Sequence, residues 1–247
     1  MKASLTGLAT VAVAGMATAQ PYNGLQVNER VFNDFPDSTL NVVNMYPSSL
    51  TISESNFGAG NFANRHMAWA SEDAGATAAP FDYEDGFDFC VTMNLNASPL
   101  DGREAGFMTD LFGFGFFGAL PNGEIAAFGS FLPFHTFGNV YTNGTDVDLR
   151  MVYRPGAGQG VLPASTIEYI IDTGSGPVSS GEIEFTNTEG GIPSGFGAKI
   201  GVGIQSQGNP GGSVDVAFTD FKFVVPAPAT GALAACGLIA AARRRRA

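Results

Sequence analysis

The stretch DVDLRMVYR (Asp146–Arg154) predicts a β-strand with one buried face. Its apolar side chains stand at every second position, and Asp146, Asp148 and Arg150 alternate with them. Because successive side chains of a strand point to opposite faces, this spacing separates an apolar face from a charged one. An amphipathic helix would instead need apolar residues three and four positions apart.

Four further segments have the same two-residue period. They are Phe87–Asn96, Thr166–Ile171, Lys199–Gln205 and Val214–Val225. In the last segment the apolar face changes after Asp220, which predicts a β-bulge near Thr219 and Asp220. Residues 33–80 are rich in Asn, Ser and Ala, and we expect short strands and long loops there.

The composition supports an all-β domain. Of the 247 residues, 33 are glycine and 14 are proline, which would interrupt long helices repeatedly. With 45% apolar residues the chain has enough hydrophobic surface to exclude disorder. Strands spaced about ten residues apart predict one antiparallel two-sheet jelly-roll sandwich over residues 20–225.

The charge distribution excludes nucleic acid as a partner. Five of the 12 basic residues stand in the first 19 or the last 22 positions, and all 23 acidic residues stand between them. The segment between the two ends therefore has 7 basic and 23 acidic residues, a net charge of −16. Such a body repels phosphate backbones and anionic lipid surfaces.

Residues 1–19 have the three parts of a secretory signal peptide. Lys2 supplies the positive start, and an apolar stretch follows. Ala17 and Ala19 are the small residues that signal peptidase needs, so Gln20 would become the new N-terminus. The alternative is a buried N-terminal helix.

The C-terminal segment, residues 226–247, also has three parts. Pro226, Ala227 and Pro228 come first, and a small-residue apolar run follows. The chain then closes on the arginine cluster Arg243, Arg244, Arg245 and Arg246. The uncharged stretch 224–242 would be about 28 Å long as a helix, enough to cross a bilayer core. One interpretation is a permanent tail anchor with its arginines in the cytoplasm.

The order of these parts resembles the PEP-CTERM sorting signal of bacterial envelope proteins, which exosortase-type membrane enzymes recognise. Pro226 and Pro228 match that signal, whereas Ala227 stands where it has glutamate. The resemblance implies an exported protein of the cell envelope or the extracellular space, transiently anchored by its C-terminal helix and cut near Pro228. Proteins with this signal often accompany exopolysaccharide and biofilm production.

The segment from Asp146 onward resembles concanavalin A-like lectin and glucanase domains. The resemblance rests on the strand VDLR (Val147–Arg150) and on a closing strand VAFTDFKF (Val216–Phe223). It implies the same two-sheet jelly roll and, by analogy of fold, extracellular polysaccharide as a partner.

An acidic segment before the strand at Phe87 is the candidate metal site. Its carboxylates are Asp82, Glu84, Asp85 and Asp88. Calcium prefers oxygen-rich loops of this kind, and its charge would offset their mutual repulsion. The alternative is a solvated acidic loop. No other cofactor is predicted.

Aromatic side chains are the candidate sugar platforms, and Trp69 and Tyr83 suit that role best because each has a polar group. The unusual run Leu111–Gly118 places Phe112, Phe114 and Phe116 on one face and Phe117 on the other. Core packing is the favoured role for these four phenylalanines.

No catalytic residue is assigned. Glu182 and Glu184 approximate the carboxylate strand of concanavalin-like glucanases, but Asn187 replaces the third carboxylate. His66 and His135 are far apart without a zinc-ligand pattern around either. Cys90 is expected to be a small buried residue without a disulfide partner in the body.

The favoured function is a non-enzymatic carbohydrate-binding or biofilm-matrix protein. A polysaccharide-degrading hydrolase or lyase of the same fold is the first alternative. A structural matrix subunit without a small ligand, with an exposed edge strand for assembly, is the second.

Overall fold

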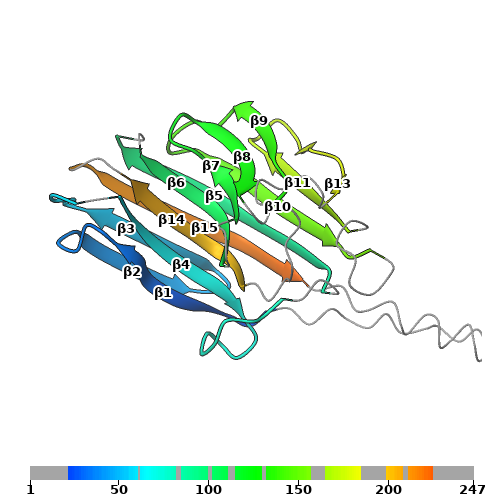
Figure 1. Ribbon diagram of the computed structural model, residues 1–247, viewed down its shortest axis with the longest axis horizontal. Helices are drawn as coiled ribbons and strands as arrows, with labels where there is room; N and C mark the ends of the chain where they lie inside the picture. Colours follow the sequence, from blue (N-terminus) through cyan, green and yellow to red (C-terminus); the bar gives the residue numbers. More distant parts are fainter. Residues whose placement is uncertain are drawn as a thin grey trace, which may run out of the picture. The chain divides into compact units, whose positions relative to one another are not determined.

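Two antiparallel β-sheets pack face to face in the computed structural model (Figure 1). It describes residues 22–60, 62–81, 85–99, 102–110, 115–129, 132–156, 165–184, 199–207 and 211–224. Residues Pro21–Val225 form a compact unit by themselves. Every member of the described core lies inside that unit, so it contains the hydrophobic surface that it needs to fold alone.

The first sheet has seven strands in the order β1-β4-β14-β6-β7-β8-β9, all neighbours being antiparallel. These strands are β1 (Gly24–Asn33), β4 (Ala63–Ser71), β14 (Lys199–Gln207), β6 (Arg103–Asp110), β7 (Gly115–Ala119), β8 (Glu124–Gly129) and β9 (His135–Asn139).

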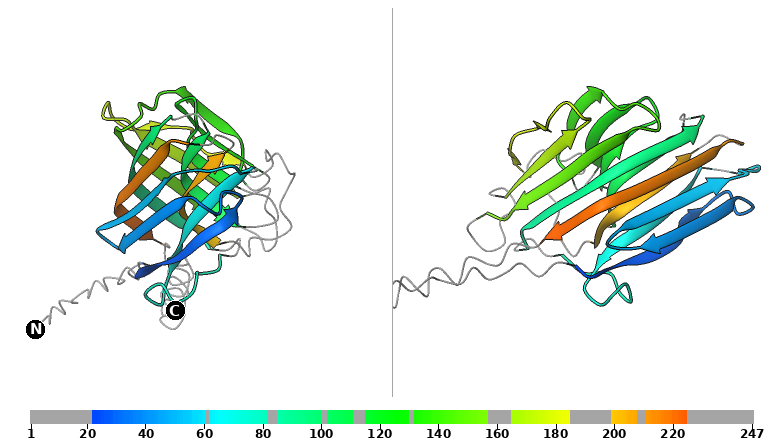
Figure 2. Two further views of the ribbon diagram at one scale, coloured as in Figure 1. Left: turned by 90° about the vertical axis from the view of Figure 1, so that its left-hand side faces the viewer. Right: turned by 180° about the vertical axis from the view of Figure 1, so that it is seen from behind.

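The second sheet has eight strands, in the order β12-β11-β10-β5-β15-β3-β2, with β13 also paired to β11. These strands are β12 (Val178–Ser179), β11 (Thr166–Asp172), β10 (Asp146–Arg154), β5 (Phe87–Ser98), β15 (Ser213–Val224), β3 (Ser49–Ser55), β2 (Thr39–Met45) and β13 (Ile183–Glu184). Figure 2 shows both sheets from the side and from behind.

The core lies between the sheets, where the alternating apolar side chains meet. The five patterned segments form β5, β10, β11, β14 and β15, which confirms the all-β prediction. In β5 the residues Phe87, Phe89 and Val91 are fully buried. Phe89 stacks on Phe223 of β15 with ring centroids 4.5 Å apart, so aromatic packing joins the central strands.

The predicted bulge in β15 is confirmed. The register between β15 and β5 shifts between Thr219 and Lys222, and Asp220 has a positive φ of 53°. The extra residue moves the inward face of β15 from Phe218 to Phe221 and Phe223.

Two expectations are wrong. Residues 33–80 do not hold only short strands, because β2, β3 and the nine-residue β4 lie there. The pattern of β4 is hidden because residues on both of its faces are buried. Cys90 is not a core residue: its neighbours Phe89 and Val91 point inward, so it lies half-buried on the opposite face of the eight-stranded sheet.

Glycines allow the central strands of the seven-stranded sheet to approach closely. A Cβ at Gly201 of β14 would lie 2.1 Å from the carbonyl oxygen of Ala68. A Cβ at Gly118 of β7 would lie 2.1 Å from the carbonyl oxygen of Ala105. Both contacts are with backbone of a neighbouring strand, which cannot move aside without breaking the ladder.

We therefore predict that Gly201→Ala lowers the free energy of unfolding by about 2 kcal/mol or more, because overpacking forces the strands apart. The control is Gly58→Ala, where an added Cβ would have nothing within 4 Å. Urea denaturation of residues 20–225 measures both. Equal stability of the two variants would contradict the close approach of β14 and β4.

Candidate functional site

The candidate site is the outer face of the seven-stranded sheet, the face turned away from the eight-stranded sheet. Ala68 of β4, Val202 of β14 and Phe107 of β6 point into the core, so their neighbours along each strand point outward. Three outward rows cross these strands. One is polar, one is made mainly of glycine and one is apolar.

The polar row joins three strands that are distant in sequence. Arg65, Gln205 and Glu104 are cross-strand neighbours on β4, β14 and β6. The Arg65 guanidinium donates from Nε (2.8 Å) and from Nη2 to Oε1 of Gln205. The Nε2 of Gln205 donates to Oε2 of Glu104 at 3.3 Å, and Nε2 of Gln207 donates to Oε1 at 3.1 Å. The guanidinium also lies 4.7 Å from the ring centre of Phe32.

Glu104 is the titratable group of this row. Glu104 is only 7% exposed. Burial raises the pKa of Glu104 to about 7, and the positive charge of Arg65 opposes that rise. A carboxyl group with this pKa exchanges protons near neutral pH, which ordinary glutamates do not.

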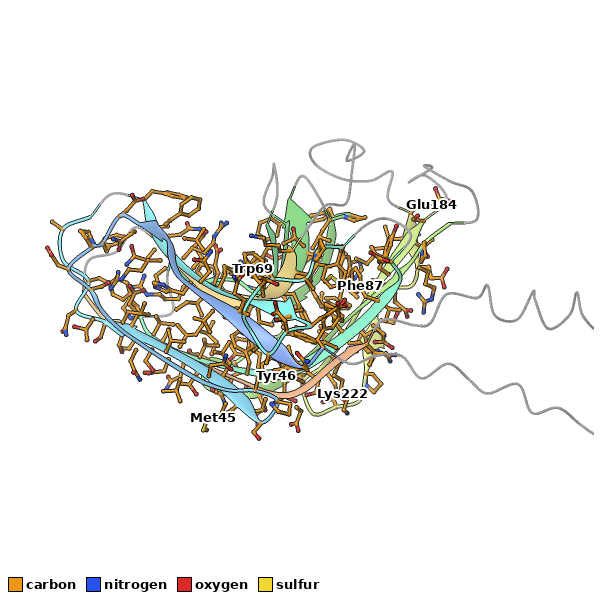
Figure 3. The ribbon with its side chains drawn as sticks, turned by 90° about the horizontal axis from the view of Figure 1, so that it is seen from below. Met45, Tyr46, Trp69, Phe87, Glu184 and Lys222 are labelled. Atoms are coloured by element: carbon orange, nitrogen blue, oxygen red, sulfur yellow. The ribbon has the colours of Figure 1, made fainter. Side chains whose placement is uncertain are left out.

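The apolar row contains the only tryptophan of the chain. Trp69 of β4 and Met108 of β6 lie on either side of Gly201 of β14, and Phe116 of β7 is the next cross-strand neighbour of Met108. Met67 packs with them. Trp69 is 3% exposed, and its Nε1 has no hydrogen-bond acceptor among the described residues. An unpaired buried donor costs about 1–3 kcal/mol. In Figure 3 Trp69 lies above Met45 and Lys222, which belong to the eight-stranded sheet.

The row between them begins with Met67 of β4, and its other members are small. Gly203, Gly106 and Gly118 are cross-strand neighbours, and Ala126 of β8 continues the row. The polar and apolar rows are therefore separated by Met67 on β4 and by small residues on β14, β6, β7 and β8.

A second polar cluster is buried between the sheets. His66 Nδ1 accepts the backbone N–H of Arg30 (3.1 Å), so its Nε2 carries the proton and donates to Oε2 of Glu54 at 2.8 Å. Oε1 of Glu54 accepts from Ser38 Oγ and from Asn64 Nδ2, both at 2.6 Å. Ser38 thus contacts the carboxylate and not the imidazole, which is not the arrangement of a nucleophilic triad.

This second cluster is structural. Burial alone would raise the pKa of Glu54, but the hydrogen bonds from His66, Ser38 and Asn64 together lower it. The ionised carboxylate joins β3, β4 and the segment between β1 and β2.

Two of the predicted calcium ligands, Asp82 and Glu84, lie outside the described residues, as does the predicted sugar platform Tyr83. Asp88 lies on the outward face of β5, where its carboxylate accepts two hydrogen bonds from Arg150 at 2.7 and 2.6 Å. Within the described ranges no group of three or more His, Cys, Asp or Glu side chains could hold a metal ion. Calcium binding by Asp82–Asp88 stays a prediction.

The other candidate side chains are separated by the fold. Glu182 forms an ion pair with Arg154 (3.4 Å), and the Glu184 side chain is exposed on β13 at the sheet margin. His135 lies on the edge strand β9, away from His66. Phe117 is in the core and Phe116 in the apolar row, whereas Phe112 and Phe114 fall outside the described residues. Sugar binding by Trp69 stays a prediction.

The targeting signals lie outside the described residues. They comprise Ala17, Ala19, Gln20, Pro226, Ala227, Pro228 and Arg243–Arg246. In the part of the chain that the structure describes, no helix is long and apolar enough to cross a membrane.

No protein-family model matches the chain, and no curated protein matches it. An alginate lyase from Corynebacterium sp. is a similar solved structure, with 11% identity, coverage of 84% of this chain and 99% of that chain, and a TM-score of 0.45. A protein of unknown function from Shewanella oneidensis is 12% identical, with coverage of 91% of this chain and 98% of that chain and a TM-score of 0.43. The lectin UEA-II in complex with galactose is 12% identical, with coverage of 83% of this chain and 96% of that chain and a TM-score of 0.38. The fold rests on the strand pairing above, and the function has to be argued from the chain's own side chains.

The raised pKa of Glu104 predicts a pH-dependent stability. The folded chain binds this proton more tightly than the unfolded chain, so stability is lost as the pH rises from the usual value of 4.5 through about 7. Glu104→Gln removes that loss. The difference in free energy of unfolding between the E104Q variant and wild type should therefore change by about 2 kcal/mol in favour of the variant from about pH 5 to about pH 8.

Urea denaturation across this pH range measures the gain. The same substitution at the exposed Glu182 is the control. An E104Q variant whose stability follows wild type across the range would contradict a proton held at Glu104.

Glu54 predicts the opposite pH dependence. Because its pKa is lowered, its contribution to stability is present above the usual value and is lost as the pH falls below it. Glu54→Gln should cost about 3 kcal/mol at neutral pH and should flatten the acid limb of the stability curve. Ser38→Ala removes one donor and should cost about 1 kcal/mol. Parallel acid limbs for E54Q and wild type would contradict the assignment.

Proposed function

We propose that the chain is an exported envelope or extracellular protein that binds polysaccharide on the outer face of the seven-stranded sheet without cleaving it. A signal peptide cut before Gln20 would deliver it, and an exosortase-type enzyme would process the tail at Pro226–Pro228. The observation that carries the binding proposal is the polar row Arg65–Gln205–Glu104, in which hydrogen bonds join a guanidinium, an amide and a carboxyl group across three strands.

The polar row of this face suits a sugar polymer. Arg65 and the two glutamines have donors that match hydroxyl and carboxylate oxygens. Trp69 is 3% exposed, so its indole packs in the apolar row and does not present an open ring to a ligand.

A polysaccharide lyase is the second candidate. Glu104, with a pKa of about 7 beside a guanidinium, favours it, because a general acid or base works best when its pKa lies near the working pH. A lyase would release unsaturated sugar ends and a hydrolase would release reducing ends, whereas a binding protein releases neither.

Binding is tested with residues 20–225 on a panel of neutral and acidic polysaccharides that includes those of the source organism. Arg65→Gln should weaken binding at least about tenfold, because the charged donor of the row is lost. The control Arg154→Gln removes the same charge from the other sheet, where Arg154 pairs with Glu168 at 2.9 Å, and should leave affinity unchanged.

The panel also separates the alternatives. Binding that a calcium chelator abolishes would support a metal at Asp82–Asp88, and binding indifferent to chelator would leave the sugar site without it. Release of sugar ends would replace the binding function with a catalytic one. Absence of both binding and cleavage would contradict the proposal and favour a structural matrix subunit.

A further inference from the structure

The sandwich has four lateral edges among the described strands, and three of them are interrupted. In β1 the register shifts between Asn28 and Phe32, where Arg30 has a positive φ of 58°. The register of β8 with β9 shifts between Ile125 and Ala126, and β12 and β13 have two residues each. Bulges and short strands of this kind prevent an edge from pairing with another chain.

The fourth edge, β2, has none of these devices. Its seven residues, TLNVVNM, pair with β3 without interruption from Thr39 to Met45. The strand has no charge and no proline. Val43 is 40% exposed and Met45 is 59% exposed, so apolar side chains stand beside the unpaired backbone edge.

Charge indicates what can pair with this edge. The body has a net charge of −16, so most approaches between two copies bring carboxylates together. The outward residues of β2 and of β3 are uncharged, and the carboxylate of Glu54 is buried inside. Two copies can therefore meet here without like charges facing each other.

We propose that β2 is the contact between two copies of this chain, paired antiparallel across a two-fold axis. The backbone donors and acceptors of a strand edge are complementary to the same edge turned by 180°, so the contact closes on itself. A register centred on Val42 places Asn41 opposite Val43 of the second copy. The two eight-stranded sheets then form one continuous sheet. This inference does not depend on the proposed function.

The test is the oligomeric state of residues 20–225 by sedimentation over a concentration series. We expect a dimer, and Val43→Lys should raise its dissociation constant at least about tenfold, because two lysines would lie beside the axis. Val140→Lys is the matched control: it adds the same charge at a valine that is 43% exposed and outside β2. Urea denaturation checks that both variants are folded.

Hydrogen exchange locates the contact. The backbone amides of residues 39–45 should exchange more slowly at dimer concentrations than at monomer concentrations in wild type, and not in V43K. A wild-type chain that remains monomeric at about millimolar concentration would overturn the proposal. So would open polymers, equal dissociation of V43K and V140K, or protection confined to another edge.

Discussion

The close approach of β4, β14, β6 and β7 is the constraint on which the outer face depends. Side chains at Gly201 or Gly118 would collide with the backbone of the neighbouring strand. The glycines therefore do two things at once. They let the strands lie close enough to bury the core on one side, and on the other side they leave only small residues on β14, β6 and β7 between a polar and an apolar row. A residue chosen for packing thus shapes the surface that a ligand would meet.

The two buried glutamates show how one fold treats the same side chain in two ways. Glu54 accepts from donors on β4 and on the segment between β1 and β2, and these hydrogen bonds outweigh the effect of burial on its pKa. Among the described residues, Glu104 accepts amide donors from Gln205 and Gln207 at 3.3 and 3.1 Å, and the effect of burial on its pKa dominates. The first environment suits a fixed structural charge, and the second suits a group that changes its protonation.

Sequence periodicity predicted the strands that have one buried face, such as β10 and β5, and it located the bulge at Asp220. It failed for β4, because residues on both faces of that strand are buried and no alternation remains. The site residues Arg65, Glu104 and Gln205 were not predicted, since they come together only through the order of strands in the sheet. The pair Gln205 and Gln207, two apart on a strand, was the one local signal available.

The central claim is that polysaccharide binds across the outer face, and the fluorescence of Trp69 tests it most directly. Because Trp69 is the only tryptophan in the chain, its emission reports on this face alone. We predict that a bound polysaccharide changes the intensity or wavelength of this emission with the same saturation curve as binding, and that Arg65→Gln shifts both curves together. Saturable binding that leaves Trp69 emission unchanged would place the ligand elsewhere and contradict the account.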